Sequence, residues 1–257
     1  MAKLRKPSAL FRHIERLQGD RPWGWMLDAG TGVNSLRWVS GLETDRWTAV
    51  AGSARERDFS QEAVQDRMRS GDQVIAGNWG DPDFLKGESF DTVLADYLLG
   101  AIEGFAPYFQ PYLFARLRPL TKDRLYITGL EPYVPTHRPE DAAGRVVWEI
   151  GRFRDSCMLL SGVMPYREYP ALWVCDRLRE SRFSILKVKH FDIRHGPKFV
   201  DAQINLCAPS LDRIEDRSLA EALRQHGESL RQQAHKIIDS EGALRTGQNY
   251  VIAAKAV

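Results

Sequence analysis

The stretch Trp25-Met26-Leu27-Asp28-Ala29-Gly30-Thr31-Gly32-Val33-Asn34-Ser35-Leu36 decides how this chain folds. Its first residues are apolar and predict a buried strand over 25–27, which the carboxylate of Asp28 follows. Two spaced glycines come next, and we expect a helix over about 35–40. Glycines let the backbone approach a ligand where a Cβ would collide, and a helix N-terminus presents unpaired N–H groups. The stretch therefore predicts a cofactor site of the nucleotide-binding type.

The acid before the first glycine narrows the choice of cofactor. A loop that cradles a pyrophosphate gains nothing from a carboxylate aimed into it, because like charges repel. S-adenosylmethionine (SAM) has no phosphate and carries a sulfonium and an ammonium. Asp28 therefore favours SAM over a dinucleotide.

Composition limits the class of protein. The length of 257 residues suits one large α/β domain, residues 1–257, with insertions. The chain has 36 Lys and Arg against 34 Asp and Glu, a net charge of +2, which is too balanced to indicate a nucleic-acid surface. The N-terminal segment is the exception, and we interpret its basic residues as a solvated face; they are Lys3, Arg5, Lys6, Arg12 and Arg16, opposed by Glu15.

Cysteine spacing and hydropathy point to a protein of a reducing compartment. Cys157, Cys175 and Cys207 lie far apart and show neither a disulfide framework nor the spacing of a metal site. No apolar run approaches the roughly 20 residues of a membrane span, and the N-terminus lacks the apolar core of a signal peptide. We expect a cytoplasmic protein without a membrane partner or a metal.

Strand and helix patterns alternate along the chain, which is typical of a doubly wound, mostly parallel sheet. We expect seven strands, over 25–27, 47–51, 73–76, 90–95, 124–130, 184–193 and 249–254. The expected helices cover 8–18, 35–40, 60–69 and 169–180, with two shorter helices in 99–117 because Pro107 and Pro111 interrupt that segment. The predicted fold class is thus α/β and Rossmann-like.

Two helical insertions follow strands five and six. The insertion over 139–165 carries Val146, Val147, Ile150 and Phe153 on one helical face. The insertion over 210–245 predicts a long amphipathic helix that packs on the body or on a partner. Its apolar stripe consists of Leu219, Ala222, Leu223, Leu230, Ala234, Ile237 and Ile238, and we assign structural roles to His226 and His235.

Several segments together resemble the class I SAM-dependent methyltransferases. They are 27–32, Gly77-Asn78-Trp79, 89–96 and the final strand pair. The similarity covers most of the chain in element order and is strongest from about residue 23 to residue 131. The resemblance implies a seven-stranded sheet with an antiparallel last strand, SAM as cofactor and transfer of its methyl group to an acceptor.

The resemblance also implies roles for individual residues. Asp28 would orient the glycine loop and meet the methionine ammonium, while the loop residues Ala29, Gly30, Thr31 and Gly32 would lie against the cofactor. Asn78 and the backbone of Trp79 would contact adenine. Asp96 would face the methionine end of the cofactor together with Tyr97.

Two positions depart from the pattern of the family. Asn34 stands in place of the third glycine, and it tolerates a left-handed backbone better than most residues. Ala51 stands where an acid usually binds the ribose hydroxyls. Ser53 or Glu56 is the candidate replacement.

The acceptor is expected to be a small molecule, with a protein side chain as second choice. After strand four the sequence reads Ala95-Asp96-Tyr97-Leu98 and not Pro-Pro-Tyr/Phe, which disfavours methylation of nucleic-acid amines. Tyr97, Glu131 and Tyr133 are candidates for acceptor binding. Asp96 is the first candidate for a catalytic base, ahead of Glu131, His137 and His195. A homo-oligomer remains open.

Two other functions fit parts of the sequence. In an NADP-dependent oxidoreductase, Arg55 and Arg57 would hold the 2′-phosphate and Ala51 would not be anomalous. A non-catalytic relative would keep the fold as an interaction module and dock through the helix of 211–245.

Overall fold

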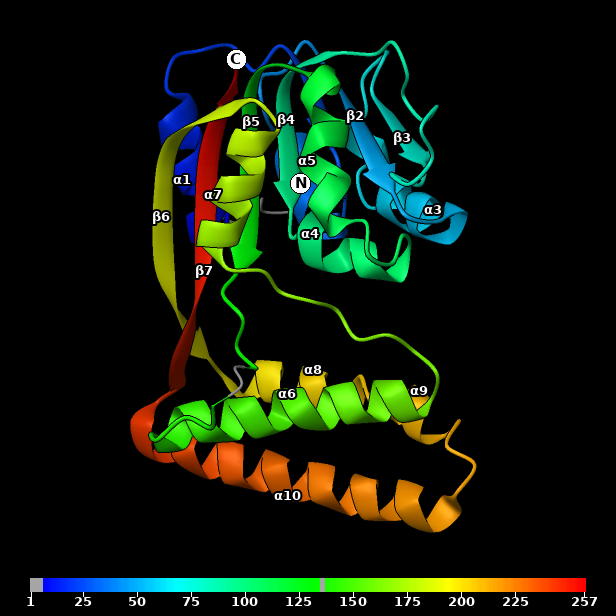
Figure 1. Cartoon of the computed structure of the whole chain (residues 1–257), viewed down its shortest axis with the longest axis vertical. Helices are drawn as coiled ribbons and strands as arrows, with labels where there is room; N and C mark the ends of the chain where they lie inside the picture. Colours follow the sequence, from blue (N-terminus) through cyan, green and yellow to red (C-terminus); the bar gives the residue numbers. More distant parts are fainter. Residues whose placement is uncertain (1–6, 135–136) are drawn as a thin grey trace. The chain divides into compact units, whose positions relative to one another are not determined.

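The computed structural model describes residues 7–134 and 137–257; Lys3, Arg5 and Lys6 of the predicted basic face lie outside the described residues. Seven strands form one sheet in the order β3-β2-β1-β4-β5-β7-β6, with β7 between β5 and β6 (Figure 1). The sheet is mostly parallel with one antiparallel hairpin, which confirms the predicted fold class. The strands are β1 (Trp25–Asp28), β2 (Arg46–Ala51), β3 (Gln73–Ala76), β4 (Phe90–Asp96), β5 (Thr121–Leu130), β6 (Phe183–His195) and β7 (Leu244–Ala256).

Parallel pairing at the centre of the sheet brings the ends of several strands together. In β1, Asp28 is level with Ala49 of β2 on one side and with Leu94 of β4 on the other. Asp96 lies two residues further along β4, and Ala51 lies two residues further along β2. These residues therefore share the carboxyl edge, where ligands bind in open α/β sheets.

Alternate residues of β5 pack on opposite faces of the sheet. Leu125 and Ile127 belong to a core shared with α4 (Leu98–Ala101), α5 (Gln110–Leu117) and α7 (Ala171–Glu180). The intervening Tyr126 points to the other face, where its hydroxyl donates to Gln18 at 2.7 Å. The aromatic rings of α1 (Ala9–Gln18) and α2 (Val33–Val39) pack there, since Phe11 stacks on Trp38 with ring centroids 4.4 Å apart.

The prediction of a helix over 60–69 is wrong. The structure has α3 (Ala54–Glu62) and then only one 3-10 turn (Gln65–Arg67). Ser53 sets the earlier start, because its hydroxyl accepts a hydrogen bond from the backbone N–H of Glu56 and so caps α3.

The predicted break within 99–117 is confirmed. A 3-10 turn (Ile102–Gly104) follows α4 directly, and α5 begins only at Gln110. Pro107 lies between the two helices. Pro111 lies in the first turn of α5, where its missing N–H costs no intrahelical hydrogen bond.

The chain divides into two compact units. The first consists of residues 1–129, 169–190 and 250–257, and the second of 130–168 and 191–249. Where the sequence predicts one domain with two insertions, the structure groups both insertions in the second unit. Its helices are α6 (Ala142–Leu160), α8 (Pro197–Asn205), α9 (Ala208–Leu211) and α10 (Arg217–Glu241).

The second unit has its own hydrophobic core, which α6, α8 and α10 form together (Figure 1). Leu230 and Ala234 of α10 are buried as predicted. Leu219 and Ala222 are exposed, whereas Gly227, which the predicted stripe did not include, is buried. The predicted stripe is wrong here because Gly227 lies against the ring of Phe153, where a side chain would collide. Among the helices described, none is both long and apolar enough to cross a membrane.

Candidate functional site

Two carboxylates lie at the carboxyl edge of the sheet, as the sequence predicts from their positions after β1 and within the end of β4. Asp28 is fully buried, and within the described chain its oxygens make no well-formed hydrogen bond, although the hydroxyls of Thr31 and Ser35 lie close enough to lower its pKa. Asp96 accepts a hydrogen bond from the Thr128 hydroxyl at 2.5 Å. Burying an ionised carboxylate costs free energy, and a cationic ligand at this edge would offset that cost.

Burial raises the pKa of both acids. It raises the pKa of Asp28 to about 7 against the effect of the nearby Thr31 hydroxyl, and the charge of Asp96 adds to the rise. Burial also raises the pKa of Asp96 to about 6, although the hydrogen bond from Thr128 opposes it.

No cationic side chain of the described chain acts on either carboxyl. The pKa of Asp28 reflects burial, the nearby donors Thr31, Ser35 and Gly30 and the charge of Asp96, whereas that of Asp96 reflects burial and the Thr128 hydroxyl. A ligand that brings positive charge to this edge would stabilise both ionised forms. We call Asp28 and Asp96 the acid pair.

The glycine loop beside the acid pair is fixed by three neighbouring elements. The N–H of Ala29 donates to the carbonyl of Leu94 in β4, and the N–H of Thr31 donates to that of Val50 in β2, each at 2.8 Å. The buried indole of Trp79 donates to the carbonyl of Ala29 at 2.7 Å. The loop is therefore rigid before any ligand binds, which lowers the entropy cost of binding.

The two glycines of the loop differ in their surroundings. A Cβ at Gly30 would meet the side chain of Leu98 at 2.7 Å, so Gly30 allows α4 to pack closely. A Cβ at Gly32 would meet nothing within 4 Å. Space beside the backbone of Gly32 is thus open for a ligand.

The side chains of Asn78 and Trp79, the residues predicted to contact adenine, make hydrogen bonds within the first unit. The Asn78 amide donates to the carbonyl of Phe105 at 2.9 Å and accepts from the N–H of Gly80 at 2.8 Å. Trp79 is in the core, where it supports the loop. Sequence reasoning missed this supporting role, because nothing in the sequence around Trp79 shows which carbonyl its indole reaches.

The end of β2 is covered by an aromatic ring. Ala51 is buried, and a Cβ at the following Gly52 would lie 2.4 Å from the ring of Phe105. The Ser53 hydroxyl is engaged in capping α3, and Glu56 is exposed on that helix. Glu56, in the first turn of α3, is thus the exposed acid that follows this strand end.

The residues predicted to bind the acceptor fall in different units. Tyr97 belongs to the first unit, where it follows Asp96 with a left-handed backbone (φ 48°). Glu131 and Tyr133 belong to the second unit. The backbone N–H of Glu131 donates to the carbonyl of Gln248, and the Tyr133 hydroxyl accepts from Arg154. Within a single unit, only Glu131 and Tyr133 lie together, and acceptor binding by the three residues stays a prediction.

The alternative bases His137 and His195 belong to the second unit. His137 is exposed, and His195 is the last residue of β6. Burial lowers the pKa of His195, although a hydrogen bond to the backbone of Thr246 opposes this. Within the described residues no cluster of His, Cys, Asp or Glu is suited to hold a metal ion.

Comparison with known proteins identifies the fold. No family model and no curated protein matches the chain. The magnesium protoporphyrin IX methyltransferase of Synechocystis PCC 6803 with bound SAH is 14% identical at a TM-score of 0.52, over 96% of this chain and 80% of that one. Coclaurine N-methyltransferase bound to N-methylheliamine and SAH is 16% identical at a TM-score of 0.53, over 96% and 71%.

The fold is that of the class I SAM-dependent methyltransferases. The cyclase SpnF has this methyltransferase fold as well, at 15% identity and a TM-score of 0.55 over 96% of this chain and 80% of that one. At such identities the likeness establishes the methyltransferase fold and leaves the chemistry to be argued from the site itself.

The residues at the carboxyl edge fit the amino-acid end of SAM. The acid pair suits its cationic groups, and the open space beside Gly32 suits a ligand that lies against the loop. At the end of β2 the ribose acid is absent and Phe105 covers the strand. The site thus offers charged partners to the amino-acid end of SAM and none at Ala51 to its ribose.

Proposed function

We propose that this chain is a SAM-dependent methyltransferase that acts on a small molecule. The observation that carries the proposal is the acid pair, a fully buried Asp28 and a half-buried Asp96 at the carboxyl edge, without a cationic partner among the described residues. The resemblance of the glycine loop and the methyltransferase fold support the same conclusion.

Each residue of the site has a distinct task in this proposal. SAM, when bound, supplies an electrophilic methyl group on its sulfonium. Asp28 attracts the ammonium, and Gly30 and Gly32 let the backbone lie against the cofactor. Asp96 interacts with the cationic end of SAM and accepts a proton from an acceptor that must lose one, since its raised pKa of about 6 suits a base near neutral pH.

Binding to the adenosine end depends on Phe105. With no acid at Ala51, the ribose hydroxyls lack the charged hydrogen-bond acceptor that would otherwise hold them. The ring of Phe105, which packs on Gly52, has to move or to stack on the incoming group. We therefore expect a weaker hold on the ribose than a carboxylate would give.

The acid pair also argues against NADP. A dinucleotide would place pyrophosphate charge at a loop whose nearest titratable groups are carboxylates, which is electrostatically unfavourable. Arg57 of α3 is engaged with Asp58 at 2.7 Å, although Arg55 is exposed and available. An oxidoreductase is thus the weaker interpretation.

Calorimetric titration with SAM, its demethylated product and NADP tests the proposal. We expect SAM to bind and Asp28→Ala to weaken that binding at least tenfold, or about 1.4 kcal/mol. Asp20→Ala, which removes an exposed acid of the same unit, is the matched control and should leave the affinity unchanged. Binding of NADP alone, or equal SAM affinity for folded Asp28→Ala, would show that the proposal is wrong.

Methyl transfer itself needs a second experiment. With purified protein, SAM and a pool of small-molecule metabolites, release of the demethylated cofactor should depend on the pool and should be lost in Asp28→Ala. If SAM binds but only protein fractions support release, the acceptor is a protein side chain. If SAM binds without any release, the chain is a SAM-binding module and not an enzyme.

A further inference from the structure

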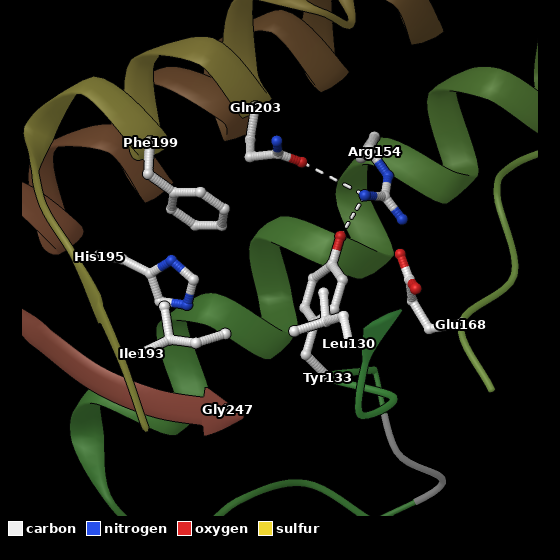
Figure 2. Close-up of a pocket in the computed structure, with 9 residues that line it drawn as sticks. All are labelled: Leu130, Tyr133, Arg154, Glu168, Ile193, His195, Phe199, Gln203 and Gly247. Carbon is white, nitrogen blue, oxygen red and sulfur yellow. Dashed lines mark hydrogen bonds between the residues drawn. The ribbon is translucent and has the colours of Figure 1, made fainter. Parts of the chain in front are cut away.

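The second unit encloses a cavity of about 150 Å³ that the methyltransferase site does not use. All nine residues around it belong to this unit, and Figure 2 shows them: Leu130, Tyr133, Arg154, Glu168, Ile193, His195, Phe199, Gln203 and Gly247. A cavity of this volume is large enough for a single six-membered ring. Its two ends differ in character.

One end of the cavity is polar and is organised around the guanidinium of Arg154. Its Nη1 donates to the Tyr133 hydroxyl and to the Gln203 amide oxygen, and its Nε and Nη2 donate to Asp155. These four bonds use four of the five N–H groups of an arginine. The remaining N–H belongs to Nη2, on the side where Figure 2 shows the carboxyl of Glu168.

Glu168 faces Arg154 without pairing with it. The two side chains are close enough for Arg154 to lower the pKa of Glu168, yet no ion pair within 4.0 Å and no hydrogen bond joins them. Burial outweighs this influence and raises the pKa of Glu168 to about 7. A hydroxyl between them can accept from Nη2 of Arg154 and donate to the carboxyl of Glu168.

The other end of the cavity is suited to a ring. The rings of His195 and Phe199 lie against each other with centroids 3.9 Å apart, and Ile193 and Leu130 complete the wall (Figure 2). His195 is held neutral by burial, which lowers its pKa. Gly247, with φ of +80°, contributes a backbone wall without a side chain.

Charge balance favours a neutral ligand. Arg154 and Arg167 share the carboxylate of Asp155, at 2.8 Å and 3.6 Å, so the ionised form of Glu168 balances the second positive charge and a neutral ligand preserves that balance. A carboxylate in the cavity would meet the carboxyl of Glu168, and an ammonium would meet the guanidinium of Arg154. Neither charged group gains an uncompensated partner.

We propose that this cavity of the second unit binds a small neutral ring compound with one hydroxyl, of the size of phenol, held through Arg154 and Glu168. All residues of this cavity belong to the second unit, whereas the acid pair belongs to the first, and the proposed binding needs no cofactor. Its test therefore uses the full chain without SAM, and its failure would leave the proposed methyltransferase activity untouched.

Amide NMR titration with phenol tests this site directly. We expect saturable shifts at the amides of Phe199, Gln203 and Gly247, and at least tenfold weaker binding of toluene, benzoate and benzylamine, which keep the ring and replace the hydroxyl. Equal binding of toluene would overturn the hydroxyl site. Tighter binding of benzoate or benzylamine would overturn the choice of a neutral ligand, and shifts confined to other residues would overturn the location.

Variants of Glu168 separate ligand binding from folding. Glu168→Leu removes the acceptor and should weaken phenol binding at least fivefold while toluene binds at least as well as before. Glu168→Gln keeps an acceptor oxygen and should retain phenol binding within about twofold. Glu215→Gln changes an exposed acid of the same unit and is the control. Unchanged phenol affinity in Glu168→Leu, or its loss in Glu215→Gln, would contradict the proposal, and retained amide dispersion shows that each variant is folded.

Discussion

The ionised form of Asp28 is disfavoured by burial in the fold and would be favoured by a cationic ligand. In the protein alone, burial favours the neutral carboxyl, as its raised pKa of about 7 shows. A cationic cofactor would favour the ionised form. Folding therefore favours the protonated carboxyl and binding of a cation favours the ionised one, and both effects can be measured.

Asp28→Asn should stabilise the protein without ligand by up to about 4 kcal/mol at pH 8. The folded chain keeps the Asp28 proton up to about pH 7, whereas the unfolded chain loses it near 3.8. Stability therefore falls as the pH rises through that window, and Asn has no proton to lose. Urea unfolding at pH 8 should show the gain, and at pH 4 the difference should disappear. A variant that is less stable than the parent at pH 8 would contradict this account.

SAM should bind at least tenfold more tightly at pH 7.5 than at pH 5.5. The acid pair has pKa values of about 7 and about 6, so both carboxyls are largely protonated at the lower pH and have to release protons when a cation binds. Calorimetry in two buffers of different protonation enthalpy should show proton release at pH 5.5. Binding that is independent of pH, or that takes up protons, would rule out the acid pair as the cation site.

Individual residues were predictable where a strand end fixes them. Asp28, the glycine loop and Asp96 follow from apolar runs that end on polar residues, because parallel strands end at one edge. The capping role of Ser53 was not predicted, since a capping hydroxyl and a ribose-binding hydroxyl look alike in sequence. The partners of Trp79 and Arg154 are distant in the chain, so no local pattern shows them.

At the scale of elements, α4 and the turn after it define how the carboxyl edge is covered. Leu98 packs on Gly30, and Phe105 packs on Gly52. Both contacts depend on glycine, and Asn78 fixes the same segment through the carbonyl of Phe105. The sequence predicts the break between the helices of 99–117 but not that the intervening residues fold over β2.

Gly52→Ala should destabilise the first unit by about 1–3 kcal/mol, because the added Cβ would lie 2.4 Å from the rigid ring of Phe105. The loss should shrink in the double variant with Phe105→Ala, since the collision partner is then absent. Chemical unfolding of the parent, both single variants and the double variant gives the coupling energy. Additive losses would show that the ring does not touch Gly52.

Helix boundaries were predictable to within a few residues where a cap or a proline marks them. α7 and the break before α5 are examples, because proline ends or begins a helix for a local reason. The apolar stripe of α10 was predicted less well, since burial of Gly227 depends on Phe153 of another helix. The periodicity of apolar residues along one helix cannot show burial that depends on a ring of another helix.

At the scale of the molecule, the two units have separate hydrophobic cores. The core of the first unit contains Leu125 and Ile252, and that of the second contains Ile150 and Leu230. The sequence predicts the seven-stranded sheet and both insertions. It does not show that 139–165 and 210–245 fold together, because contacts over that separation produce no local pattern.

Leu230→Ala should loosen the second unit selectively. Leu230 is fully buried, and its truncation should cost about 2–5 kcal/mol, whereas Leu219→Ala at an exposed position of the same helix should cost much less. Hydrogen exchange followed by mass spectrometry should show faster exchange in α6, α8 and α10, with protection of β1 and β4 retained. Equal loss of protection in both units would mean that they unfold as one.

The two longest strands carry a consequence for biosynthesis. β6 passes from the first unit to the second after His190, and β7 returns from the second to the first after Asn249. Until β7 has been translated, the first core lacks Tyr250, Ile252, Ala254 and Ala256. The ribosome must therefore synthesise both insertions before the sheet can close, and a nascent chain stalled before β7 would expose apolar surface to chaperones.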